Sequence, residues 1–257
     1  MTGERTAPDT DQENYWFRRH EVVYLYLKGL CRGKSIIEAG AGEGYGVDLL
    51  ASSAETIVAL DYDYLACRHA ASKYGQHHTH FLQADLTNIP LASNSVDAIV
   101  NSQVIEHLPD QPAFMEECYR VLRPGGELYV ATPNRITFTP KGQPINPFHL
   151  RELNARELAA LFVDADFTFS RCYGVYHGEY LQELDRKWHG IINAQLQPYL
   201  ENRPWSTELR TDVDSVTAAD FELREIPVSA ITDSLSATAP TDLDDSLDLF
   251  FIGRKER

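Results

Sequence analysis

A turn that carries glycine at every second position constrains the fold of this chain more than any other feature. An apolar strand is predicted at 36–37, glycine then recurs from Gly40 to Gly46, and a second apolar segment at 56–60 runs into Asp61. Glycine lets a backbone adopt positive φ and approach a ligand closely. A glycine turn between a strand and a helix, followed about twenty residues later by a carboxylate, is typical of parallel sheets that bind an adenosine-containing cofactor.

Strands and helices alternate along the chain. In the first half, the pattern predicts strands at 36–37, 56–60, 80–83, 96–100 and 127–131, and helices at 13–29, 46–54, 64–73 and 111–122. Strands separated by helices indicate an α/β fold with a doubly wound, mostly parallel sheet. In the second half, we expect a helix at 154–165, a loop at 234–245, and strands at 166–174, 221–226 and 246–252.

Length and net charge limit the domain organisation and the possible partners of the chain. We expect a flexible N-terminus at 1–12 and a single domain at 13–257, with a helical lid inserted at about 175–215. The net charge of −15 argues against a nucleic-acid partner. The four cysteines lack metal or redox spacing, and no signal or membrane segment is apparent. These features predict a cytoplasmic protein with no membrane partner, and a homodimer stays open.

Three details bear on the choice of cofactor. The place where the dinucleotide pattern needs its third glycine holds another residue, whether the count starts from Gly40 or from Gly42. Glu38 precedes the turn, where a carboxylate suits a cationic amino acid tail better than a pyrophosphate. Asp61 can accept both ribose hydroxyls. Together they favour S-adenosylmethionine (SAM) over NAD, and the alternative is a tight turn followed by an aspartate that faces solvent.

Further motifs follow in order along residues 33–135, and with them the chain resembles the class I SAM-dependent methyltransferases. The matching segments are 38–44, Asp61, Ala84 with Asp85, 105–108 and 120–126. The resemblance implies a Rossmann-like, seven-stranded, mostly parallel sheet. By it, the turn lines the methionine and ribose portions, Asp61 holds the ribose and Asp85 meets the adenine. The cofactor contacts that we expect in this part of the chain are Glu38, Gly40, Gly42, Asp61, Tyr62, Ala84, Asp85, Asn101 and Gln103.

A narrower resemblance reaches both ends of the chain. Short segments at 3–6, 13–20, 132–135, 146–149, 151–154 and 245–248 are similar to those of mycobacterial sugar O-methyltransferases associated with methylglucose lipopolysaccharide and methylmannose polysaccharide. The resemblance implies that Tyr15, Trp16 and Arg19 cover the cofactor from an N-terminal helix. The alternative is a helix that only packs on the edge of the sheet.

Methyl transfer to a sugar hydroxyl benefits from a general base, because the hydroxyl is a poor nucleophile. Such a base must follow the fourth or fifth strand, where His149, Glu106 and His107 lie. We expect His149 to be the base, with Glu106 next. Each candidate has an alternative interpretation. His149 would only pack against Pro147 and Phe148 and order its loop, and the segment around Glu106 would have a structural or cofactor-facing role.

The sequence leaves a metal undecided. Mg²⁺ could acidify the acceptor hydroxyl through carboxylate ligands, for which Asp244, Asp245 and Asp248 are candidates, although a solvated acidic loop is the simpler interpretation. The histidines at 77–80 are interpreted as a solvent-exposed turn. The leading hypothesis is a SAM-dependent O-methyltransferase of a sugar or oligosaccharide. The alternatives are a methyltransferase of another small molecule, such as a quinone or lipid, and a binding protein without turnover.

Overall fold

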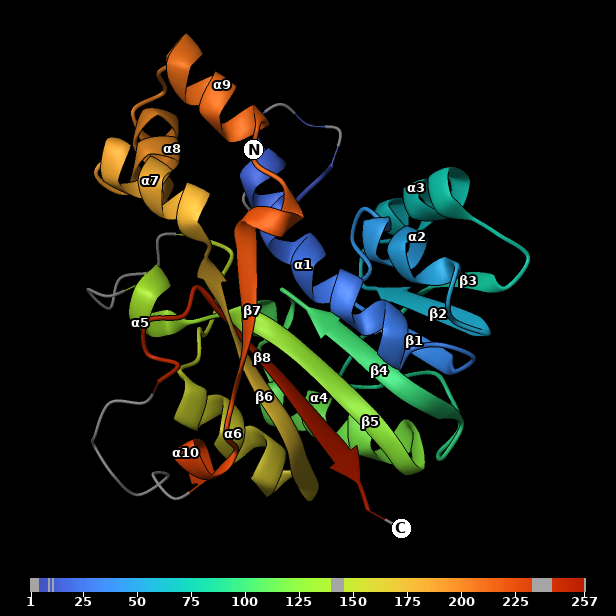
Figure 1. Ribbon diagram of the computed structural model, residues 1–257. Coiled ribbons are helices and arrows are strands. Elements are labelled where there is room, and N and C mark those ends of the chain that lie inside the picture. Colours follow the sequence, from blue (N-terminus) through green and yellow to red (C-terminus); the bar gives the residue numbers. More distant parts are fainter. Residues whose placement is uncertain (1–4, 9, 11, 140–145, 233–241, 257) are drawn as a thin grey trace.

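A single mixed sheet with helices on both faces forms the centre of the computed structural model, which describes residues 5–8, 10, 12–139, 146–232 and 242–256 (Figure 1). Eight strands are hydrogen bonded in the order β3-β2-β1-β4-β5-β8-β6-β7. Their bounds are β1 Ser35–Ala39, β2 Thr56–Asp61, β3 Thr79–Gln83, β4 Val96–Ser102, β5 Leu122–Pro133, β6 Phe167–His177, β7 Phe221–Ile226 and β8 Asp248–Lys255.

Strand direction confirms the predicted doubly wound fold. Strands β1 to β5 pair in parallel, β8 runs antiparallel to its neighbours β5 and β6, and β7 runs antiparallel to β6. The family resemblance implies seven strands and the structure has eight, because β7 joins the sheet as an edge strand beyond β6.

Two hydrophobic layers hold the helices to the sheet. One contains buried side chains of α4 and α6, and the other contains those of α1, α2 and the helices α7 and α9 (Figure 1). The helices are α1 Asn14–Leu30, α2 Tyr45–Ala51, α3 Tyr64–Tyr74, α4 Gln111–Val121, α5 Arg135–Phe138, α6 Ala155–Asp164, α7 Glu179–Lys187, α8 Ile191–Leu200, α9 Thr207–Asp214 and α10 Ser229–Thr232, with short 3₁₀ turns η1 Ile105–His107 and η2 Ala218–Asp220.

Local sequence explains where several elements begin. The Asp110 side chain accepts a hydrogen bond from the Ala113 amide at the start of α4, and Asn154 forms a capping box with Glu157 at the start of α6. The predicted start of the fifth strand at 127 is wrong: β5 begins at Leu122, directly after α4, and the register with β4 shifts so that Val96 pairs with Leu122 and Ala98 with Glu127.

The helical segment of the second half lies at one end of the sheet. Strand β6 continues through His177, and the helices α7, α8 and α9 follow it and lie near the N-terminal end of α1 (Figure 1). Residues 1–4, 9 and 11 of the expected flexible N-terminus and 233–241 of the expected loop lie outside the described residues.

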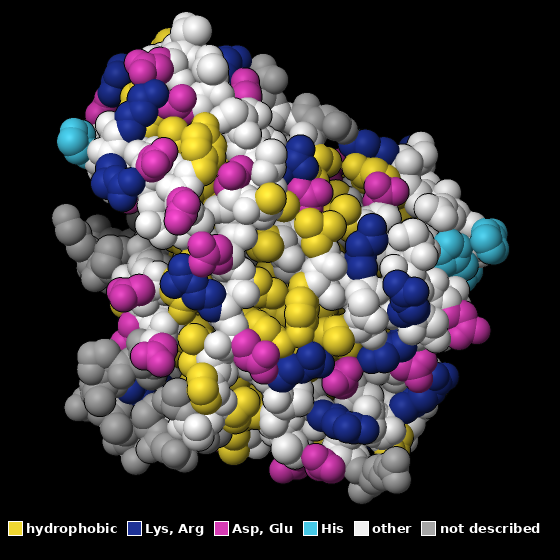
Figure 2. All heavy atoms as spheres, viewed as in Figure 1, with side chains coloured by type: hydrophobic (Ala, Val, Ile, Leu, Met, Phe, Trp, Pro, Cys, Tyr) yellow, Lys and Arg dark blue, Asp and Glu magenta, His cyan; other side chains and the backbone are white. Residues whose placement is uncertain are grey.

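The surface in the same view carries charges of both signs. Figure 2 shows a band of hydrophobic side chains across the middle of this face, surrounded by intermixed Lys, Arg, Asp and Glu. Across the described ranges of the chain, no helix is both long enough and apolar enough to cross a lipid bilayer.

Candidate active site

A cavity of about 830 Å³ opens where the carboxyl ends of the central parallel strands meet α1. This volume lies in the upper part of the range for small-molecule sites, which suits a cofactor together with an acceptor. Its floor is the glycine turn after β1, its roof includes Trp16 and Arg19 of α1, and its far wall is the segment 146–150. Ligands of open α/β sheets bind at this edge.

The glycine turn leaves room for a ligand by its backbone conformation. Gly40 has φ +86°, and a Cβ atom there would lie 2.4 Å from Cγ2 of Val104. Gly44 has φ +90° and caps α2. A residue with a side chain at position 40 would therefore have a strained backbone and would overlap Val104 in the loop after β4, which explains why this position needs glycine.

Asp61 and Asp85 both line the cavity. The Asp61 carboxylate accepts hydrogen bonds from the Gly42 amide at 2.8 Å and from the Asp63 amide at 2.9 Å, and Arg5 approaches it at 3.4 Å. Asp85 is exposed, and hydrogen bonds from the Thr87 amide and hydroxyl lower the pKa of its carboxyl. Asp61 thus links the glycine turn to β2.

Of the other residues named for the cofactor, some line the cavity and some lie behind its wall. Gly40, Gly42, Tyr62 and Gln103 are in the lining, and Tyr62 is largely exposed. The buried residues behind the lining are Tyr15, Glu38, Ala84 and Asn101.

Glu38 is the most unusual of these buried residues. It is 2 % exposed, and its Oε1 accepts a hydrogen bond from the Tyr24 hydroxyl at 2.6 Å. Its Oε2 is buried and has no hydrogen-bond partner among the described residues. Burial raises the pKa of the Glu38 carboxyl to about 7. A carboxylate oxygen without a partner beside a glycine cradle fits a cofactor that brings a cationic amino acid tail.

Helix α1 both packs on the sheet and lines the cavity. The Arg19 guanidinium donates two hydrogen bonds of 2.6 Å to the Asp248 carboxylate, and a third reaches the Leu247 carbonyl. Gln103 also donates to Asp248, at 3.2 Å. Asp248 is 1 % exposed, so the interpretation of this residue as part of a solvated acidic loop is wrong. The Tyr15 hydroxyl meets Nε2 of His177 at 2.6 Å.

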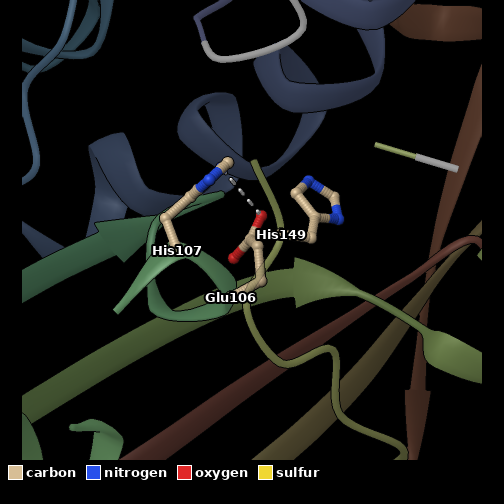
Figure 3. A group of neighbouring side chains, drawn as sticks. All are labelled: Glu106, His107 and His149. Atoms are coloured by element: carbon tan, nitrogen blue, oxygen red, sulfur yellow. Dashed lines mark ion pairs between the residues drawn. The ribbon is translucent and has the colours of Figure 1, made fainter. Parts of the chain in front are cut away.

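Glu106, His107 and His149 come together at the other end of the cavity (Figure 3). Glu106 and His107 belong to the turn η1 after β4, and His149 lies on the loop after β5. His107 Nε2 is 4.0 Å from Glu106 Oε1, and the two imidazole ring centroids are 4.8 Å apart. The topology thus unites three side chains that the sequence named separately.

The segment that carries His149 is fastened to η1 by backbone hydrogen bonds. The amides of Leu150 and Arg151 both donate to the Glu106 carbonyl, at 2.8 Å and 3.1 Å. Gln111 donates to the carbonyls of Ile105 and Arg151, at 2.9 Å each. The position of His149 relative to Glu106 is therefore set by the backbone.

Hydrogen bonds also determine which imidazole nitrogens carry protons. His107 Nδ1 lies 2.9 Å from the Phe148 carbonyl, which can only accept, so Nδ1 is the protonated nitrogen. His149 Nδ1 lies 2.7 Å from Glu152 Oε1, and its Nε2 faces the Asn146 amide nitrogen at 3.1 Å. The Phe148 amide donates to Asn146 Oδ1, which orients the amide nitrogen of Asn146 toward His149. In the neutral form of each imidazole, Nε2 is therefore the nitrogen that holds the lone pair.

The carboxylates named for Mg²⁺ do not form a site for it. Arg19 engages Asp248, and Asp244 and Asp245 lie outside the cavity lining. Mg²⁺ prefers an octahedron of oxygen ligands. In the group of Glu106, His107 and His149, two of the three ligand atoms are imidazole nitrogens, so this donor set does not fit Mg²⁺.

The sheet order, the glycine cradle and the Asp61 site define a class I methyltransferase fold with a cofactor cavity. A family model described as "Methyltransferase domain" matches residues 37–130. A protein of Mycobacterium tuberculosis, named a probable S-adenosylmethionine-dependent methyltransferase, is 49% identical over 98% of this chain and 88% of its own length. A relative of that name in Mycolicibacterium smegmatis is 48% identical over 98% of this chain and 93% of its own.

Solved structures agree on the fold. A SAM-dependent methyltransferase from Thermotoga maritima superposes with a TM-score of 0.62 at 17% identity, covering 94% of this chain and 93% of that one. One from Mesorhizobium loti gives 0.54 at 14% identity, covering 91% and 97%. The chain belongs to the SAM-dependent methyltransferases, and SAM is its cofactor.

Arg5 and Glu152 are among the residues at the site that were not predicted. Arg5 reaches Asp61 and Asp63 from the N-terminal segment, where the sequence predicted only flexibility. Glu152 orients His149 from three residues further along the chain. The second could have been suspected, because a carboxylate that follows a histidine by three residues can reach its ring, but the loop conformation decides it.

Proposed function

We propose that this methyltransferase transfers the methyl group of SAM to a hydroxyl of a sugar or oligosaccharide. Bound SAM supplies a methyl group on a sulfonium, which is displaced in line by the acceptor oxygen. The observation that carries the proposal is the polar group of Glu106, His107 and His149, which lies in the same cavity as the glycine turn. A hydroxyl needs help to lose its proton, and these are the side chains that can give it.

The residues of the cofactor side act by binding and orientation. We propose that Asp61 receives the ribose hydroxyls, that Asp85 meets the adenine amino group, and that Glu38 faces the cationic tail of the methionine portion. We propose that Trp16 and Arg19, which line the cavity, cover it from α1 and exclude water from it. Alignment of two reactants in a closed site can supply several kcal/mol of the barrier reduction.

The acceptor side is built for a partly apolar molecule. Pro133, Phe138, Pro147, Phe148 and Leu150 line it around the polar group. Apolar faces of a sugar ring, and still more those of a partly methylated sugar, pack against such walls. The same walls favour the second candidate, a quinone or lipid acceptor, and a binding protein without turnover stays a third. The cytoplasmic location and the homodimer stay predictions.

Methyl incorporation from radiolabelled SAM separates these candidates. Glucose and mannose oligosaccharides, free and partly methylated, are compared with quinols as acceptors. We expect label in an oligosaccharide, and we expect Glu106→Gln to abolish it while S-adenosylhomocysteine still binds. Label in quinols alone would contradict the sugar proposal and support the second candidate, a quinone or lipid acceptor. Cofactor binding without label in either class would point to the third.

A further inference from the structure

We propose that Glu106, His107 and His149 form a binding site for one divalent transition-metal ion at the acceptor end of the cavity. One ligand atom from each of these residues lies within 4.8 Å of the other two. Figure 3 shows the three side chains directed toward a common space from η1 and from the loop after β5. Metal–ligand bonds of about 2.0–2.2 Å bring such atoms to within about 3–3.5 Å of one another, so small side-chain movements complete the site.

Each of the three side chains is held from behind. The Phe148 carbonyl holds Nδ1 of His107 at 2.9 Å, and the Glu152 carboxylate holds Nδ1 of His149 at 2.7 Å. The Thr132 hydroxyl donates to Glu106 Oε2 at 3.0 Å. Histidine ligands of metals typically donate their other nitrogen to a carbonyl or carboxylate in this way, which fixes the tautomer and the ring direction. The outer partners of a metal site are therefore already in place.

The atoms that remain for an ion are Nε2 of each histidine and Oε1 of Glu106. His107 Nε2 takes no hydrogen bond within the described parts of the chain, and its nearest charged neighbour is Glu106 Oε1 at 4.0 Å. His149 Nε2 accepts from the Asn146 amide at 3.1 Å, and an ion would replace this single bond. A metal ligand must present a lone pair, and both histidines do.

The donor set selects the kind of ion. Two imidazoles and one carboxylate suit Zn²⁺, Co²⁺ or Fe²⁺, whereas Mg²⁺ and Ca²⁺ need oxygen ligands. Three protein ligands leave at least one coordination position open, as in catalytic rather than structural sites. Because the group lines the cavity, that position faces the space that the acceptor would occupy.

The role of the ion rests on the proposed function. An acceptor hydroxyl at the open position would have its pKa lowered, and its proton would pass to water. The oxygen would then form a bond to the methyl carbon as the S–CH₃ bond breaks, and the electron pair of that bond would stay on the sulfur of S-adenosylhomocysteine. Glu106, His107 and His149 would act together, which differs from a single general base.

Metal binding can be measured without SAM and without an acceptor. Chelator-stripped, tag-free protein is titrated with Co²⁺, followed by visible absorption and calorimetry, and with Zn²⁺, followed by calorimetry. We expect one ion per chain, and a loss of affinity of at least about 100-fold in His107→Ala and in Glu106→Gln. Glu152→Gln should weaken binding by about 10- to 100-fold, as outer partners of metal sites do. His80→Ala, in the exposed histidine segment on β3, is the matched control and should bind as the parent does.

Several results would overturn the site. These are no binding of either ion at millimolar concentration, binding that His107→Ala and Glu106→Gln leave intact, or binding that His80→Ala removes. Circular dichroism and binding of S-adenosylhomocysteine verify that each variant is folded, and His107→Asn replaces any variant that is not. Because the readout is the ion, a failure to methylate sugars leaves the site standing. Full methylation of a sugar in the presence of chelator would remove the role of the ion and leave the proposed function.

Discussion

The buried pair of Arg19 and Asp248 joins two segments that are 229 residues apart in the chain, and its disruption is the strongest stability test that the structure offers. The two side chains are 2 % and 1 % exposed, and two hydrogen bonds of 2.6 Å connect them. Asp248→Asn leaves the guanidinium buried without its counter-charge. We expect it to lower the free energy of unfolding by about 3–5 kcal/mol, the usual cost of removing one partner of such a pair.

The double variant shows whether that loss comes from the pairing. In Arg19→Met with Asp248→Leu, no charge stays buried, and apolar replacements of buried ion pairs are often neutral in stability. We therefore expect the double variant to be more stable than Asp248→Asn, although it gives up the bonds to Leu247 and Gln103. Urea unfolding followed by circular dichroism gives the free energies for the parent, for Asp248→Asn, for the single variants Arg19→Met and Asp248→Leu, and for the double variant.

Additivity is the result that would refute this reasoning. Contacting residues of one network should show a large interaction energy in a double-mutant cycle, whereas independent residues add. If the losses of Arg19→Met and Asp248→Leu simply sum in the double variant, the two side chains do not stabilise the protein as a pair. Arg19 would then contribute through its hydrogen bond to the Leu247 carbonyl and its packing against Trp16 and Phe138.

Three further predictions concern the cofactor side. Burial raises the pKa of Glu38 from 4.5 to about 7, so its stability contribution is present below 4.5 and is lost as pH rises through 7. Glu38→Gln should remove about 3 kcal/mol of that decline in urea unfolding of the cofactor-free protein between pH 5 and 8, and an unchanged decline would contradict it. Asp61→Asn should lower the affinity for S-adenosylhomocysteine by about 10- to 100-fold in calorimetry, since hydrogen bonds to a charged group contribute about 1.5–3 kcal/mol. A change of affinity under about twofold would exclude Asp61 as the residue that binds the ribose. Gly40→Ala should abolish binding of S-adenosylhomocysteine. Adding Val104→Ala should restore part of it, because the overlap between the new Cβ and Val104 is relieved while the positive φ at position 40 remains. Full restoration would show that the positive φ does not contribute to the loss of binding.

The cofactor side could be predicted from sequence because its determinants are local. The turn from Gly40 to Gly46 and the carboxylate of Asp61 lie within one strand–helix–strand unit, so spacing alone relates them. The hydrogen bond from the Gly42 amide to Asp61 follows from that unit. Helix caps at Asp110 and Asn154 are local in the same sense.

Partners that lie far apart in the chain could not be predicted. Asp248 looked like one of several acidic residues in a loop, and only the antiparallel insertion of β8 between β5 and β6 buries it beneath α1. The sequence placed Glu106 and His149 after the fourth and fifth strands as separate candidates and did not predict that they lie together. The hydrogen bonds of Glu152 and Asn146, which decide what the imidazole can do, depend on the loop conformation.

This division explains why the cofactor is easier to assign than the acceptor. SAM meets a surface made by consecutive units of the parallel sheet, and any chain that keeps that topology keeps the surface. The rest of the cavity lining comes from segments that lie far apart in the chain, such as α1 with Trp16, the loop with His149 and α8 with Leu196. None of these segments is constrained by the pairing of the parallel strands, so each can change without loss of the fold. The chemistry of the acceptor must therefore be argued from side chains at that end of the cavity, where Glu106, His107 and His149 are the groups able to act on a hydroxyl.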